Sequence, residues 1–127
     1  MTPFGLFLEN IRRSRQLQQK QLAADLGIQA SYISSLEKGR KAPPSKKIME
    51  KLISVLDLNE EEQNAMWDSA EQSKRSFQLP DNMVLAEYQL INELRKQLGT
   101  LNQGQITLML NVLALNATAS QRSNTGR

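Results

Sequence analysis

The sequence predicts an all-α protein in which a five-helix domain is followed by a helical hairpin. Apolar residues recur at spacings of three and four along most of the 127 residues, which is the period of an amphipathic helix. Residues that favour helix starts, such as Thr2 and Ser45, and residues that favour helix ends, such as Gly27 and Gly39, separate these runs. We expect a domain at residues 1–73, a linker at 74–80, a hairpin at 81–117 and a disordered tail at 118–127.

The composition leaves little material for catalysis. The sequence has no Cys and no His, so disulfides, zinc sites and Ser-His or Cys-His catalysis have no residues to build on. A general acid/base pair among solvated helix carboxylates is a weak alternative, and we expect no catalytic residue, no metal and no cofactor. The sequence has neither a bilayer-spanning apolar run nor a signal-peptide pattern, so we expect a cytoplasmic protein without membrane contact.

Charge is unevenly distributed along the chain. Residues 1–51 carry ten Lys/Arg against four Asp/Glu, residues 52–73 carry six Asp/Glu and no Lys/Arg, and residues 74–127 carry six Lys/Arg against three Asp/Glu. A basic segment favours contact with phosphates through counterion release. A solvated basic face explains the charge alone equally well.

Residues 18–39 read as two short helices joined by a tight turn, and the rest of the chain is organised around them. Leu22, Ala23 and Leu26 form the apolar stripe of the first helix. Gly27 is suited to end it because glycine adopts a left-handed backbone at little steric cost. The second helix is expected at residues 29–38, closed by Gly39.

The second of these helices has a face that suits DNA better than packing. At about 100° per residue, Ile33 and Leu36 set its buried direction. The opposite face carries small hydrogen-bonding side chains and one cation: Ser31, Ser34, Ser35 and Lys38. Hydroxyl groups can donate or accept hydrogen bonds in a DNA major groove.

The other helices of the first domain follow from capping residues and apolar spacing. Thr2 is the expected cap of a first helix whose core face comprises Phe4, Phe7, Leu8 and Ile11. Ser45 is the expected cap of a helix at residues 46–56 with Ile48, Leu52 and Val55 on its core face. Asn59 and Glu62 form an approximate capping box for the fifth helix, which packs through Met66, Trp67 and Ala70. Acidic neighbours favour a core role for Trp67 over base stacking.

The hairpin begins after the linker. Asp81 is the expected cap of a helix at residues 82–98, and a second helix is expected at residues 101–117. The second helix is apolar around most of its circumference, so it must be buried on several sides. Because two helices cannot cover that surface alone, we expect a homodimer through the hairpin; packing of the hairpin on the first domain is the alternative. The expected dimerisation residues are Val84, Tyr88, Ile91, Leu94, Leu98, Ile106, Met109, Leu110 and Leu113.

The segment LAADLGIQASYISSLEKGRKAPP resembles the helix-turn-helix of the Cro/phage-repressor (XRE) family. It carries a Leu-Ala pair, a Gly five residues after that Leu, a Ser-Tyr-Ile-Ser run, a Glu-x-Gly and a Pro at the spacing of the family. An ordinary helical hairpin in an all-α core is the alternative reading. The resemblance implies a Cro/repressor-like DNA-binding domain and a transcriptional regulator, most often a repressor, that binds double-stranded DNA.

The resemblance also implies roles for individual residues. The positions that match base-reading residues are Gln29, Ala30, Ser31, Ser34 and Ser35. The positions that match phosphate-binding residues are Gln19, Tyr32, Lys38, Arg40 and Lys41. Tyr32 and Ser34 could serve either role. A structural ion pair between Arg12 and Glu37 is implied too, with two independently solvated side chains as the alternative.

One departure from the family concerns base reading. Some relatives carry amides that can contact adenine through two hydrogen bonds, but this sequence has Ala30 and Ser31 there. Contact with a thymine methyl group or readout through water is expected instead. A homodimer would bind a pseudo-palindromic operator. The alternative function is an antitoxin or adaptor whose hairpin binds a different protein.

Overall fold

The computed structural model describes the backbone of residues 1–125 and the side chains of residues 1–115. The described chain is helical throughout and contains no strand, as the sequence predicts. It divides into two compact units, Met1–Gln78 and Leu79–Arg127. Each unit is considered by itself.

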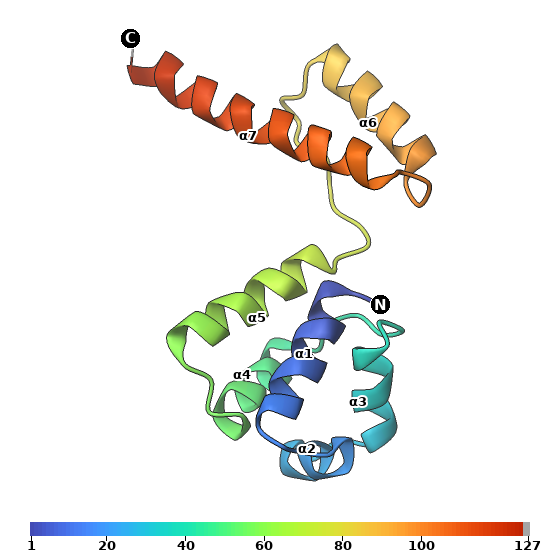
Figure 1. The fold of residues 1–127 in the computed structure, drawn as a ribbon, viewed down its shortest axis with the longest axis vertical. Coiled ribbons are helices and arrows are strands. Elements are labelled where there is room, and N and C mark those ends of the chain that lie inside the picture. The colour runs from blue at the N-terminus through green and yellow to red at the C-terminus, as the bar shows by residue number, and fades with distance from the viewer. Residues whose placement is uncertain (126–127) are drawn as a thin grey trace. The chain divides into compact units, whose positions relative to one another are not determined.

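The first unit contains five helices around one core. They are α1 (Pro3–Ser14), α2 (Gln19–Leu26), α3 (Ala30–Glu37), α4 (Lys46–Val55) and α5 (Glu60–Gln72). Helix α1 packs against α3 and α5, and α2 packs against α3 and α4 (Figure 1). The core comprises Phe4, Leu8, Ile11, Leu22, Ala23, Leu26, Ile33, Leu36, Met49, Leu52, Leu56, Leu58 and Met66.

Local capping contacts define where the helices of this unit begin. The Thr2 side chain accepts a hydrogen bond from Gly5 N–H over 3.0 Å, and Ser45 accepts one from Ile48 N–H over 3.4 Å. Asn59 and Glu62 exchange backbone-to-side-chain hydrogen bonds of 3.0 and 2.8 Å. These three predicted caps are confirmed, because each satisfies N–H groups that a helix start leaves without partners.

Two predictions about packing in this unit are wrong. Met49, Leu52 and Leu56 are the buried residues of the α4 segment, and the half-buried Val55 packs against the core as predicted, whereas the half-buried Ile48 lies outside that core. The segment carries two overlapping apolar stripes, and the one that includes Met49 belongs to the core of the unit. Trp67 is 39% exposed and does not belong to the core, because Met66 takes the buried position on α5.

The second unit contains α6 (Leu85–Gln97) and α7 (Gln103–Thr125). Helix α6 starts later than predicted, and Asp81 does not cap it. Residues 81 and 82 form a turn, and the Glu87 carboxylate accepts a hydrogen bond from Val84 N–H over 3.0 Å at the helix start.

Helix α7 continues to Thr125, past residue 117, where the sequence prediction ended it. Residues 118–125 contain neither Gly nor Pro, so no strong helix breaker interrupts them. The predicted disordered tail is therefore corrected to helix at residues 118–125. The rest of that tail, residues 126–127, lies outside the described residues.

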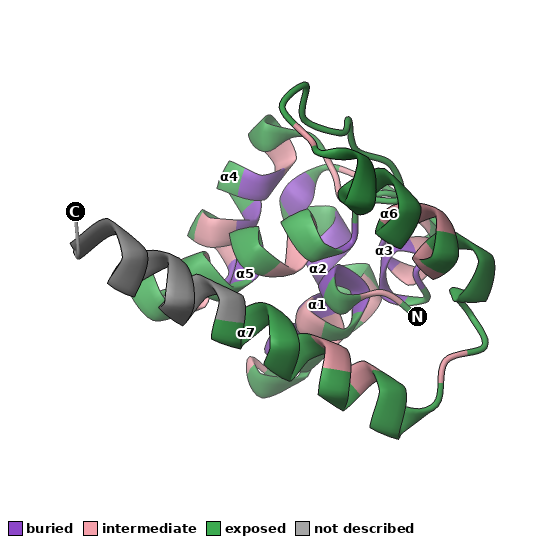
Figure 2. Cartoon of the chain, turned by 90° about the horizontal axis from the view of Figure 1, so that it is seen from above, coloured by how far each residue is buried: buried purple, intermediate pink, exposed green. Residues whose placement is uncertain are grey.

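The two units differ in burial. Buried residues gather in α1 to α5, whereas residues 79–115, the part of the second unit with described side chains, are all half-buried or exposed (Figure 2). The predicted burial of the second hairpin helix on several sides depends on a second copy of the hairpin, so for the single chain it stays a prediction. Among the described residues, no helix is long and apolar enough to cross a membrane.

Candidate nucleic-acid interface

The turn between α2 and α3 sets the direction of α3. Gly27 ends α2 in the left-handed region at φ 72°, and Ile28 follows it and packs against the core. At the other end of α3, Gly39 has φ 76°. Ile33 and Leu36 are buried beneath α3, so the opposite face of this short helix points outward.

The predicted base-reading residues lie on or beside that outward face. Gln29 and Ser31 are exposed, and the Ser31 hydroxyl lies 3.4 Å from the Gln29 amide oxygen, to which it donates a hydrogen bond. Ser34 and Ser35 are half-buried. Ala30 is half-buried as well and packs against the core, which leaves only part of it available for a base.

A network of polar side chains ties α3 to α1 and α2. Arg12 Nε donates to Glu37 Oε2 over 2.7 Å, and Arg12 Nη2 donates to Glu37 Oε1 over 3.0 Å. Arg12 Nη1 donates to the Leu17 carbonyl oxygen over 2.7 Å. The side chains of Arg12 and Glu37 are only 9% and 2% exposed. The hydrogen bond to Glu37 raises the pKa of the Arg12 guanidinium, which burial alone would lower.

Gln19 belongs to the same network. Its Nε2 donates to Glu37 Oε1 over 3.0 Å, so the amide that the resemblance assigns to a phosphate is held in place by Glu37. A second N–H of that amide remains for another acceptor. The network therefore fixes the first turn of α2 relative to the end of α3.

Cations follow α3 directly. Lys38, Arg40 and Lys41 are exposed, and no ion pair involves them among the described residues. The Arg40 N–H donates to the Ser35 carbonyl oxygen over 2.9 Å, which anchors this loop to the last turn of α3. Tyr32 is half-buried and packs against the core, leaving part of its side chain outside.

Residues 8–63 match the sequence profile of the helix-turn-helix family. The first unit is a helix-turn-helix domain. Over 58 residues the chain is 40% identical to a Bacillus subtilis (strain 168) protein named "Uncharacterized HTH-type transcriptional regulator RghRB". That alignment covers 46% of this chain and 42% of the relative, so the chain spans less than half of the relative's length.

One solved structure resembles the chain more loosely. It is a SinR protein/SinI protein complex, with 18% sequence identity and a TM-score of 0.45, covering 91% of this chain and 98% of that one. At this level the likeness supports no argument about partners.

Gly5 and Ser73 are two positions of the helix-turn-helix domain that the sequence analysis missed. A Cβ atom at Gly5 would lie 2.5 Å from the Leu36 carbonyl oxygen and 2.7 Å from that of Glu37. A glycine inside a predicted helix was the available signal for this close approach of α1 to α3. Ser73 is buried, and its Oγ accepts a hydrogen bond from Phe4 N–H over 2.8 Å.

The predicted dimerisation residues line an apolar groove only in part. The groove has a volume of about 700 Å³ and runs between α6 and α7. The predicted residues that line it are Ile91, Leu94, Ile106, Met109, Leu110 and Leu113. Val84 lies just before α6, and neither Val84, Tyr88 nor Leu98 lines the groove. Among the described residues, no group of acidic, His or Cys side chains could hold a metal ion.

Proposed function

We propose that this chain is a sequence-specific transcriptional regulator that binds double-stranded DNA as a homodimer. In this proposal it acts as a repressor by occupying a pseudo-palindromic operator, and it performs no chemistry. The observation that supports the proposal is the outward face of α3, where the exposed Ser31 and the half-buried Ser35 stand beside exposed cations on a rigid helix-turn-helix scaffold. Hydroxyl groups reach base edges, and cations hold the phosphate backbone.

The direct test is selection of binding sites by the full-length chain from random duplex DNA. We expect a pseudo-palindrome whose half-sites are separated by about one helical turn, roughly 10 bp. Selection without any enriched sequence would contradict the proposal, because non-specific phosphate binding alone enriches nothing.

Two sets of variants then separate base reading from phosphate binding. Ser31→Ala together with Ser35→Ala should change base preference, at about 1–3 kcal/mol for each lost specific contact. Lys38→Gln should weaken binding to all sequences alike. It should also reduce the salt slope, which is the slope of log binding constant against log salt concentration, by roughly one unit. If the double Ser variant kept the wild-type sequence preference, the assignment of the reading face would be wrong.

The proposed homodimer forms through the groove between α6 and α7. Large apolar side chains such as Leu108, Leu110 and Leu113 are 66%, 61% and 61% exposed in the single chain, and burial of each such side chain stabilises by about 1.5–3 kcal/mol. A second copy of the hairpin would supply two helices to cover them in a four-helix arrangement.

Sedimentation of the full-length chain and of residues 1–78 tests the dimer. We expect a dimer for the full chain at micromolar concentration and a monomer for the truncated one, which retains the whole core of the first unit. A monomeric full-length chain would favour the second candidate function, in which the same groove binds a helix of a different protein. The observation that supports this second candidate is that the groove is open and almost entirely apolar.

A further inference from the structure

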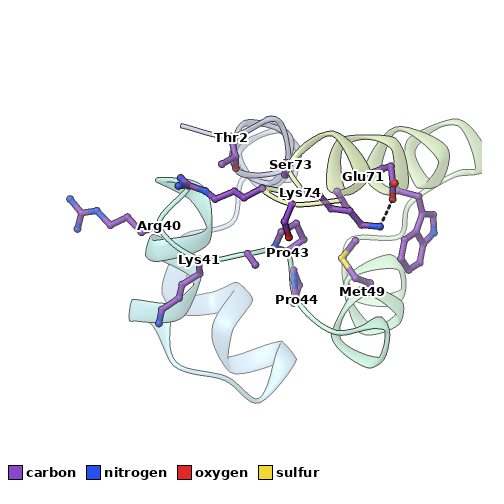
Figure 3. Close-up of a pocket in the computed structure, with 15 residues that line it drawn as sticks. Thr2, Arg40, Lys41, Pro43, Pro44, Met49, Glu71, Ser73 and Lys74 are labelled. Carbon is purple, nitrogen blue, oxygen red and sulfur yellow. Dashed lines mark ion pairs between the residues drawn. The ribbon is translucent and has the colours of Figure 1, made fainter. Parts of the chain in front are cut away.

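The helix-turn-helix domain contains a second surface feature, a cavity of about 910 Å³ next to the loop that follows α3. Its lining includes the largely apolar set Pro43, Pro44, Met49, Trp67 and Ala70. It also includes four cations from two segments that are far apart in the sequence: Arg40, Lys41, Lys74 and Arg75. Figure 3 shows Arg40 and Lys41 extending away from the two prolines, while Lys74 reaches toward Glu71.

We call Arg40 and Lys41 the first pair of cations, and Lys74 and Arg75 the second pair. The fold fixes the backbone at the start of the second pair. Ser73, directly before Lys74, is only 8% exposed. Its Oγ accepts a hydrogen bond from Phe4 N–H over 2.8 Å and donates one to the Ser69 carbonyl oxygen over 2.7 Å. The start of the segment predicted as a linker is therefore anchored to α1 and α5, and the backbone of Lys74 keeps a fixed position beside the loop after α3.

The side chains of this second pair are available to an anion. Lys74 Nζ lies 2.9 Å from Glu71 Oε2, but these two side chains are 60% and 72% exposed, and exposed ion pairs of this kind are weak because water screens them. Arg75 is exposed and makes no ion pair among the described residues. Four cations against one carboxylate around a single cavity favour binding of a polyanion over binding of a small anion with a single charge.

We infer that Lys74 and Arg75 form a further DNA-backbone site, which binds phosphates adjacent to those held by Arg40 and Lys41. The inference rests on the proposed function, because it requires the loop after α3 to lie against DNA. Both pairs of cations line the same cavity, so a DNA strand whose phosphates contact the first pair passes close to the second pair. The footprint of each protomer would then extend beyond the bases that α3 reads.

The test compares two double variants of the full-length chain that lose the same net charge. Lys74→Gln with Arg75→Gln removes the proposed contacts. Lys51→Gln with Lys96→Gln is the matched control, because both of these lysines are exposed and lie outside the cavity. Affinity for the selected operator is measured over a range of salt concentrations, on a duplex with long flanks.

We expect the salt slope to fall by about two units for the Lys74/Arg75 variant and to stay near the wild-type value for the control. Two units correspond to about a 16-fold smaller loss of affinity between roughly 50 and 200 mM salt. Base preference should not change. On a duplex trimmed to the half-sites, the variant and the wild type should have equal slopes, because the flanking phosphates are absent.

Three results would overturn the inference. The first is a slope that is unchanged, or that falls equally in the control. The second is a response of Trp67 fluorescence to inorganic phosphate alone that the variant loses while its DNA slope stays normal, which would assign the cavity to a free anion. The third is a wild-type chain without specific DNA binding, which refutes the proposed function itself. The first two leave the proposed function standing, so the two failures can be told apart.

Discussion

The ion pair between Arg12 and Glu37 gives the sharpest prediction about stability. Replacing Arg12 by Met keeps an unbranched apolar stem but removes three hydrogen bonds, two to Glu37 and one to the Leu17 carbonyl oxygen. Glu37, whose side chain is 2% exposed, then keeps only the hydrogen bond from Gln19. A buried carboxylate without its cation costs about 3–5 kcal/mol. That is a large share of the roughly 5–15 kcal/mol that stabilises a typical domain.

Urea unfolding of the full-length chain measures this loss, with Trp67 fluorescence as a probe of the first unit. If the free energy of unfolding falls by about 1.5 kcal/mol per molar urea, a loss of about 3 kcal/mol in that free energy lowers the urea midpoint of unfolding by about 2 M. The matched control is Arg13→Met. Arg13 Nη2 lies 3.9 Å from Glu9 Oε2 on an exposed part of α1, so its replacement should cost no more than about 1 kcal/mol.

A double-mutant cycle separates the ion pair from ordinary packing. Glu37→Leu alone leaves the Arg12 guanidinium buried, and the double variant Arg12→Met with Glu37→Leu leaves neither charge. The double variant should therefore lose less stability than the sum of the two single variants. Additive losses, or an Arg12→Met variant as stable as Arg13→Met, would refute the reasoning.

Two further predictions concern α1 and α5. Gly5→Ala should destabilise the domain by about 1–3 kcal/mol and lower DNA affinity, because the added Cβ must displace the Leu36 and Glu37 carbonyl oxygens at the end of α3; an unchanged melting temperature would contradict this. Glu62 has its pKa held below its ordinary 4.5 by the hydrogen bond from Arg15, then by the backbone N–H of Asn59. The ionised Glu62 should therefore stabilise the domain above pH 4.5 and lose that effect as the pH falls through its folded-state pKa. Urea midpoints of wild type and Glu62→Gln should accordingly converge at acid pH; a constant difference between them would contradict the assignment.

The features that the sequence predicts correctly are those decided within four or five residues. Thr2, Ser45 and the Asn59–Glu62 pair each satisfy N–H groups of the turn that follows them. Gly27 ends α2 in a left-handed conformation that other residues rarely adopt. Because these contacts are local, no knowledge of the tertiary structure is needed to foresee them.

Positions whose environment depends on a distant segment could not be predicted in this way. The sequence around α4 permits two apolar stripes, and only the tertiary packing of the core decides that Met49 is buried and Ile48 half-buried. The role of Ser73 depends on Phe4, which lies 69 residues away in the chain. For the same reason the sequence predicts Lys74 and Arg75 as part of a linker, although in the structure they line a cavity together with the loop after α3.

In the hairpin, the sequence identifies the apolar faces of the helices but not the surface that packs against them. Periodicity identifies which faces of α7 are apolar, but it carries no information about which surface covers them. In the single chain no residue from 79 to 115 is buried, so the hairpin has no core of its own, unlike the helix-turn-helix domain. If the hairpin forms the proposed dimer, the free energy of dimerisation and the free energy of operator binding are linked. One domain makes few base contacts, so the concentration at which the operator is occupied depends on how tightly two hairpins associate, even though these helices contain none of the proposed DNA-contacting residues.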